Sequence, residues 1–207
     1  QCVGGTCCEP VATPDQRLAA CTPGTTGCDQ GLALNTGQAL AQAFVPSAAG
    51  YLVRARLHAS NPYAPRGTAA QVLVVPGTSG TSLTASTTDV DREAIGRGDF
   101  IGGVTPDYYD VAFSPPISLT AGRVYYLVLR LTAVTTCDAP CVITSMSPTV
   151  TCECPPVRWT RVSNSTSMVD PYPAGHSFSC GAGCTLWNLD PDYRDYSFEV
   201  FLSRACD

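Results

Sequence analysis

Twelve cysteines in a chain of 207 residues, combined with the complete absence of lysine, constrain this sequence more than any other feature. An even number of cysteines at this density is typical of a disulfide framework, which persists only outside the reducing cytosol. We therefore expect an extracellular protein, either secreted or held at the cell surface. The predicted disulfide cysteines are Cys2, Cys7, Cys8, Cys21, Cys28, Cys137, Cys141, Cys152, Cys154, Cys180, Cys184 and Cys206.

The cysteines gather toward the two ends of the chain and leave residues 29–136 without any. The five that precede this gap cannot all pair with one another, and Cys206 is the natural partner for the remaining one. Four thiolates at positions 137, 141, 152 and 154 could alternatively hold zinc, although the even count in an exported chain favours disulfides. The pairing stays open, and the central part must be held together by a hydrophobic core.

Charged residues make up 14% of the chain, against about 25% in a typical domain, and the net charge is −5. Nucleic acids and anionic membranes recruit basic surfaces, so neither is an expected partner. No apolar stretch approaches the roughly 20 residues that span a bilayer, which argues against membrane insertion. The chain does not start with a charged segment followed by an apolar one, and we expect any secretion signal to have been removed before Gln1.

Residues 1–36 are rich in Cys, Gly, Thr and Pro and show no sustained periodicity, which predicts a stapled N-terminal arm apart from a turn of helix near residues 14–20. Residues 37–207 instead contain short apolar runs separated by turn residues, with a cysteine-rich insert at about 137–184. In the run 50–60, Tyr51, Val53, Ala55 and Leu57 alternate with polar residues, as in a half-buried strand. Further strands are predicted at 69–75, 82–87, 109–114, 123–133, 156–163 and 196–203. This spacing indicates an all-β fold, an antiparallel sandwich of two sheets.

Three segments carry a family resemblance: QAFVPSAAGYLVRARL at 42–57, QVLVV at 71–75 and VAFSPPISLTAGRVYYLVL at 111–129. They resemble the jelly-roll modules of bacterial extracellular and carbohydrate-binding proteins, over roughly residues 40–132 and the last strand. The resemblance implies a disulfide-stabilised jelly roll. It implies no particular function, because such modules serve as sugar binders, adhesion units and structural pieces alike.

Signatures of catalysis are absent from the sequence: there is no nucleophile elbow, zinc-protease helix or phosphate-binding loop. The two histidines, His58 and His176, are expected on an exposed strand face and in a loop, respectively. We therefore expect no catalytic residues and no enzymatic activity.

Two acidic clusters could bind calcium if their carboxylates converge in a loop. They are Asp89, Asp91 and Glu93 in one segment and Asp190, Asp192 and Asp195 in another. Solvated turns are the alternative for both, and no other cofactor is expected.

A sugar ligand would require flat aromatic faces on one exposed surface. The candidate ligand-binding aromatics are Trp159, Trp187, Tyr63, Tyr108, Tyr172 and Tyr193, although burial of both tryptophans in the core is the interpretation that we favour. Asn164 begins a glycosylation sequon, and Arg97-Gly98-Asp99 forms an integrin-type tripeptide that we expect in a loop.

The absence of lysine has two explanations. Exposed sheet edges are usually protected by charged residues, lysine above all, so a chain without lysine could have edges that pair with other chains. A genome that favours arginine codons would produce the same absence.

These features predict a non-enzymatic extracellular structural protein that assembles with copies of itself into a homo-oligomer or polymer, as a filament or surface coat. Residues 32–44 are the segment expected to add a strand to a neighbouring subunit. The alternative is a carbohydrate-binding or adhesive module that acts as a monomer and has a polysaccharide as its partner.

Overall fold

Antiparallel β-strands form nearly all of the regular structure in a computed structural model of the chain. It describes residues 2–3, 6–8, 13–19, 28–29, 33–34, 38–60, 69–79, 83, 87–103, 105–133, 157–163, 172–181, 187–190 and 194–204. Asn164, Tyr63 and Tyr193, and most of the predicted insert at about 137–184, lie outside these ranges. Among the described residues, no helix has the length and hydrophobicity needed to cross a membrane.

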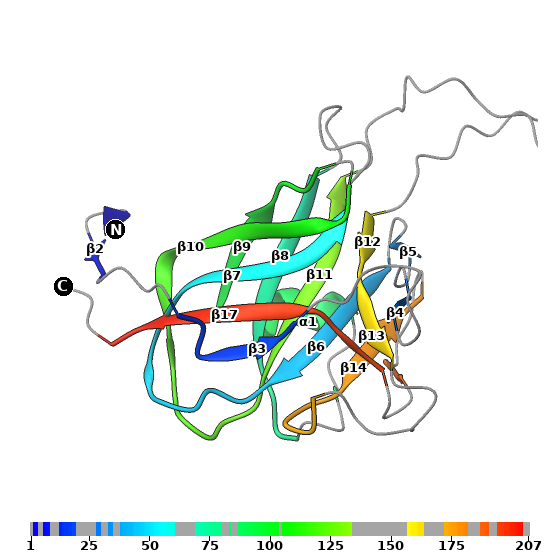
Figure 1. Ribbon diagram of the computed structural model, residues 1–207. Coiled ribbons are helices and arrows are strands. Elements are labelled where there is room, and N and C mark those ends of the chain that lie inside the picture. The colour runs from blue at the N-terminus through cyan, green and yellow to red at the C-terminus, as the bar shows by residue number, and fades with distance from the viewer. Residues whose placement is uncertain are drawn as a thin grey trace, which may run out of the picture.

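Two large sheets pack face to face (Figure 1). The front sheet contains β3 (Gln16–Leu18), β17 (Phe198–Ser203), β7 (Gly50–Ser60), β10 (Asp107–Leu119), β12 (Val157–Trp159) and β5 (Ala33–Leu34). The rear sheet contains β15 (Asn188–Leu189), β14 (Ser177–Cys180), β6 (Ala39–Phe44), β11 (Tyr125–Ala133), β8 (Ala69–Pro76) and β9 (Gly96–Phe100). The smaller elements are β1 (Cys2–Val3), β2 (Thr6–Cys7), β4 (Cys28–Asp29), β13 (Arg161–Ser163), β16 (Arg194–Tyr196) and the helix α1 (Thr87–Glu93).

The core between the sheets confirms the predicted sandwich. The alternation predicted for residues 196–203 is correct, because Tyr196 of β16 and Phe198, Val200 and Leu202 of β17 all belong to this core. Where the two sheets meet at one side, β9 packs against β10 so closely that a Cβ atom on Gly98 would lie 2.5 Å from the carbonyl oxygen of Ala112. The glycine therefore allows the sandwich to close on this side.

The central strands of the rear sheet, β14, β6, β11 and β8, are buried on both faces, whereas β9 and β15 have exposed residues. A second apolar cluster covers the outer face of the central strands, where Leu83 and the α1 residue Val90 pack with Tyr126, Val128 and Phe178. Burial on both sides explains why β6, β8 and β11 are nearly continuous apolar runs, since neither face of these strands meets water. The front sheet has its core on one face only, and its other face carries the polar side chains.

The structure corrects several local predictions. Residues 87–93 form α1, where the sequence predicts the end of a strand at 82–87 and a loop at 89–93. Residues 16–18 form β3 and not a turn of helix. Residues 97–99 lie in β9, paired with β8, so the integrin-type tripeptide is in a strand and not in a loop. Each of these segments is too short for its own periodicity to overcome its tertiary contacts.

The predicted alternation of β7 is correct for Ala55 and Leu57 and wrong for Tyr51 and Val53. The pairing of β7 with β17 shifts by one residue, so that Phe201 faces Arg54 and Leu202 faces Leu52. A bulge of this kind moves every following side chain to the opposite face. Leu52 is therefore in the core, and Tyr51 is exposed.

Parts of the predicted arm belong to the sandwich. Strand β3 pairs with β17 and β5 pairs with β12, both in the front sheet, whereas β4 pairs with β13 in a separate three-stranded sheet that also contains β16. Strand β6, within the segment expected to reach a neighbouring subunit, lies between β14 and β11 of its own sheet. Both of its edges are paired, so β6 is not available for strand addition in this fold.

Candidate functional site

The outer face of the front sheet, which we call the open face, carries a row of alternating charge across four strands. The register places Arg17 of β3 opposite Glu199 of β17, Glu199 opposite Arg56 of β7, and Arg56 opposite Asp110 of β10. Figure 1 shows these strands in front, in the order β10, β7, β17 and β3 from top to bottom. The charges therefore read positive, negative, positive, negative from β3 to β10, and we call these four residues the charge row.

Ion pairs join every neighbouring couple in the charge row. Arg17 Nε lies 3.6 Å from Glu199 Oε1, Arg56 Nη1 lies 3.5 Å from Glu199 Oε2, and Arg56 Nε lies 2.7 Å from Asp110 Oδ1. The hydrogen bond to Asp110 is the main cause that raises the pKa of Arg56 above its ordinary value, while desolvation acts in the opposite direction. Arg56 is therefore held in its charged form between two carboxylates.

The two ends of the charge row are more accessible than its middle. The side chains of Arg17 and Asp110 are 58% and 48% exposed, whereas those of Arg56 and Glu199 are 36% and 11% exposed. Exposed pairs contribute little to stability, about 0 to 1 kcal/mol each. The terminal charges are therefore the ones best placed to meet another molecule.

A second feature of the open face is an aromatic ring covered by arginines. The guanidinium carbon of Arg54 lies 3.9 Å from the centroid of the Phe201 ring, and that of Arg56 lies 5.3 Å away. Phe201 points away from the core between the sheets but is only 1% exposed. The arginine side chains thus shield an apolar group on the polar face while keeping their charged ends near water.

His58 continues the open face beyond the charge row. Its Nδ1 lies 2.8 Å from Thr160 Oγ1, and its ring meets that of Tyr108 edge-on at 5.0 Å. Burial lowers the pKa of His58 below 6.5, with a smaller opposing effect from Asp107. A half-buried imidazole between a threonine hydroxyl and an aromatic ring connects β7 to the bend between β12 and β13, which is a structural role.

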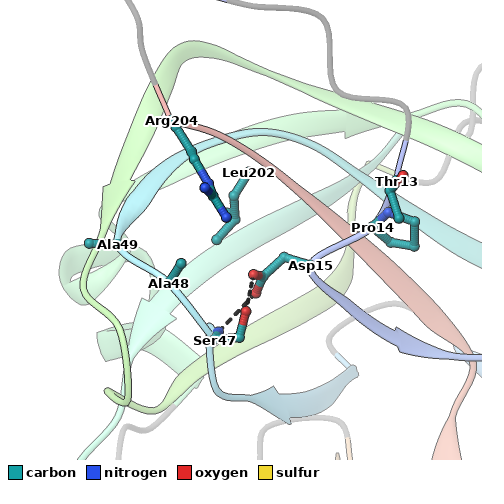
Figure 2. Close-up of a pocket in the computed structure, with 8 residues that line it drawn as sticks. All are labelled: Thr13, Pro14, Asp15, Ser47, Ala48, Ala49, Leu202 and Arg204. Atoms are coloured by element: carbon teal, nitrogen blue, oxygen red, sulfur yellow. Dashed lines mark hydrogen bonds between the residues drawn. The ribbon is translucent and has the colours of Figure 1, made fainter.

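A pocket of about 340 Å³ opens beside the start of β3 and the end of β17 (Figure 2). Asp15 accepts hydrogen bonds from the Ser47 amide at 3.0 Å and from the Ser47 hydroxyl. The Asp15 amide donates to the Val200 carbonyl at 2.8 Å. Arg204 lines the opposite side of the pocket (Figure 2). Because Asp15 fastens β3 to the turn before β7, its first role is to hold the arm segment in place.

Two buried carboxylates from the second acidic cluster are engaged by protein donors. Asp190 accepts from Ser177 Oγ at 3.0 Å and from the Tyr196 hydroxyl at 3.2 Å. Asp195 accepts from Gln42 Nε2 at 3.0 Å, and Gln42 Oε1 in turn accepts from the Tyr196 amide at 2.7 Å. These bonds join β6, β14 and β16 inside the sandwich, so Asp190 and Asp195 satisfy buried polar groups.

The calcium interpretation gains no geometric support from the described residues. Asp192 lies outside them, and in the first cluster Asp91 forms an ion pair with Arg130 while Glu93 is exposed on a helix. The side chain of Asp89 is not described. No group of three histidine, cysteine or acidic side chains that could hold a metal ion occurs within the described ranges.

The aromatic candidates do not gather on one surface. Trp159 is fully buried, stacks on Tyr196 and donates from Nε1 to the Ser197 carbonyl at 2.8 Å. Tyr172 is also buried, and Trp187 packs against the outer cluster of the rear sheet. Burial removes Trp159 and Tyr172 from any ligand surface, because a stacked sugar needs an accessible ring face. Of the described candidates, only Tyr108 lies on the open face.

The cysteines are described only in part. Cys8 and Cys180 are buried and neither is a free thiol. The side chains of Cys2, Cys7 and Cys28 are not described, and Cys21, Cys137, Cys141, Cys152, Cys154, Cys184 and Cys206 lie outside the described ranges. The disulfide framework and its pairing stay a prediction.

The sequence pattern does not predict the ion pairs of the charge row, although it places Arg56 on the polar side of its strand. Arg54, Arg56 and His58 form the predicted polar side of β7. Their partners Asp110 and Glu199 are distant in sequence, and only the strand register reveals that they lie opposite Arg56.

No family model matches this chain, and no curated protein matches it significantly. The resemblance to jelly-roll modules therefore stays a prediction, and a functional assignment depends on the geometry of the molecule itself.

Proposed function

We propose that this protein is a non-enzymatic extracellular structural subunit that assembles with copies of itself through its front sheet. The observation that carries the proposal is the difference between the two sheets. The chain covers the outer face of the central strands of the rear sheet with α1 and its neighbouring residues, whereas the open face carries a charge row with accessible ends.

The strand edges favour association through this face over association by strand addition. Strand β3 has three residues and β15 has two, which is too short to act as a strong template for another strand. Strand β10 contains Pro115 and Pro116, which lack the amide hydrogens that edge pairing requires. Strand β9 packs against β10 of its own chain.

The chemistry of the open face also supports binding over catalysis. Its charged groups neutralise one another in pairs, and His58 is hydrogen-bonded to a threonine hydroxyl. A general acid or base needs to reach a reacting group on a substrate. These side chains are instead arranged for complementarity with another charged surface.

The experiment is to express the chain with its disulfides intact and measure its mass by light scattering over a range of concentrations, with negative-stain microscopy of the same samples. Self-assembly predicts that the average mass rises with concentration and that particles larger than one chain are visible. A species that remains monomeric at every concentration would contradict the proposal.

A carbohydrate-binding module is the alternative, since Tyr51 is exposed on the open face and Tyr108 is half-buried there. Retention on insoluble polysaccharides should be measured with the wild-type chain and with Tyr51→Ala and Tyr108→Ala. Retention of a monomer that is lost in both variants would replace structural assembly with sugar binding.

A further inference from the structure

The charge row is antisymmetric about its own centre, and this determines which partner it fits. The order Arg17, Glu199, Arg56, Asp110 places a cation at one end and an anion at the other, and the two inner charges are opposite in sign as well. The centre lies between β17 and β7. Reversing the row end to end therefore exchanges every positive charge with a negative one.

We propose that the open face docks against the open face of a second copy of this chain, about a two-fold axis that runs parallel to the strands between β17 and β7. This inference rests on the proposed self-assembly. Arg17 then faces the partner's Asp110, and Arg56 faces the partner's Glu199. Each contact occurs twice, because a two-fold interface uses the same patch on both subunits.

The alternative two-fold axis, along the charge row itself, would place each charge opposite its own copy. Four like-charge contacts would then oppose association, so the sequence of charges selects the axis parallel to the strands. Phe201 adds nothing to this contact, because the arginines of its own chain already cover its ring and leave it 1% exposed. The charge row alone therefore determines the choice of axis.

The area of the open face fits a dimer of moderate affinity that salt weakens. Four strands about 4.8 Å apart span about 19 Å, and the eight residues 51–58 extend about 26 Å, which gives roughly 500 Å² per copy. The total of roughly 1,000 Å² is close to the lower limit of specific interfaces. Sheets packed face to face align to within about 30°, which long arginine side chains can accommodate. A two-fold contact closes on itself, so a filament requires a second contact elsewhere.

Charge reversal at the two accessible ends of the row tests this geometry. In a dimer of Arg17→Glu, each contact between position 17 of one copy and position 110 of the other brings two carboxylates together. In a dimer of Asp110→Arg, the same contact brings two guanidinium groups together. Either variant alone should therefore lose at least about tenfold in self-association. An equimolar mixture should recover it, because the carboxylate introduced at position 17 of one variant then faces the guanidinium introduced at position 110 of the other. All remaining contacts in the mixed dimer keep opposite charges.

The measurement is sedimentation velocity at low salt for the wild type, each variant and their mixture. Arg97→Glu, an exposed arginine on β9 of the rear sheet, is the matched control and should associate as the wild type does. Circular dichroism and thermal unfolding confirm that each variant is folded. If a variant does not fold, the wild type carries the test, because raising the salt from about 0.05 M to about 0.5 M screens the charges and should dissociate the dimer.

Self-association that is lost in each variant by itself and returns in the equimolar mixture supports the two-fold arrangement. Wild-type self-association that neither variant nor salt reduces overturns the inference and leaves self-assembly in place. Loss in both variants without recovery in the mixture overturns the proposed axis. A wild-type chain that is monomeric under all conditions overturns both the docking geometry and the proposed function.

Discussion

The guanidinium carbon of Arg54 lies 3.9 Å from the centroid of the Phe201 ring, so a charged side chain covers a large apolar residue on the open face. Because Arg54 covers the ring, Phe201 can lie on the polar outer face of the sheet without being exposed to water. The contact also connects β7 and β17 at the bulge, where the backbone register changes.

Replacement of Arg54 by alanine should expose the Phe201 ring and remove both the cation–π contact and the ion pair of Arg54 with Asp110 at 3.4 Å. We expect the free energy of unfolding to fall by about 1 kcal/mol, measured by urea unfolding at neutral pH. Arg97→Ala, on the exposed side of β9, is the control and should change it by less than about 0.5 kcal/mol. Equal effects of the two substitutions would show that Arg54 does not shield the ring.

Replacement of Gly98 by alanine should destabilise the closed side of the sandwich. Its Cβ atom would lie 2.5 Å from the Ala112 carbonyl oxygen and 2.6 Å from Val111 Cγ1, so β9 and β10 would have to separate. Overpacking of this kind costs about 1–3 kcal/mol, which thermal unfolding can measure. Gly181→Ala is the matched control, because nothing lies within 4 Å of its added Cβ atom. A Gly98→Ala variant as stable as the control would place β9 farther from β10.

Replacement of Gln42 by leucine should be among the most destabilising single changes in the described core. The glutamine donates to Asp195 and accepts from the Tyr196 amide, and all three residues are buried. An apolar residue of similar size would remove both bonds, at a cost of about 2–4 kcal/mol. Gln71→Leu provides the comparison, since its bond at 3.3 Å to Asp99 is exposed. Denaturation midpoints that shift equally would refute the role of the buried network.

The stability of the protein should depend on pH through His58. Burial lowers the pKa of this imidazole in the folded state, whereas the unfolded chain has the ordinary value of 6.5. The unfolded chain therefore takes up a proton first as the pH falls. The contribution of the uncharged His58 imidazole to the free energy of unfolding is therefore fully present above pH 6.5. It is lost as the pH falls below 6.5 through the lowered pKa of the folded state.

Urea unfolding of the wild type between about pH 5 and pH 8 measures this dependence, and His58→Gln should reduce the slope below about pH 6.5. Glutamine can still exchange a hydrogen bond with Thr160, so the variant isolates the titration. An unchanged slope in His58→Gln would assign the pH dependence to other groups.

Local alternation predicts the strands whose two sides differ clearly. Strand β7 has the predicted bounds, and Tyr196, Phe198, Val200 and Leu202 share the core as expected. The prediction fails where one extra residue changes the register, at Val53, because a bulge depends on the neighbouring strand. It also fails for residues 97–99, whose polar side chains are typical of a loop and whose position in β9 depends on pairing with β8.

The candidate site is less accessible to sequence reasoning than the fold. Burial of Trp159 confirms the interpretation favoured for this residue, whereas Tyr172, a candidate for an exposed ring, is also buried. Hydrophobic packing decides the place of such a ring, and the residues beside Tyr172 do not show which side of the segment faces the interior. The acidic clusters suggest calcium, but Asp190 and Asp195 satisfy buried donors from strands distant in sequence.

The sequence alone determined that the chain forms an antiparallel β-sandwich, because a period of two residues places apolar side chains on one side of each strand wherever the strand is formed. Tertiary structure alone decided that the central strands of the rear sheet are covered on both faces and that Arg17, Glu199, Arg56 and Asp110 lie in one line. The physical reason is that charge alternation across strands is a property of register. Register is set by contacts between segments that are distant along the chain, which no local pattern records.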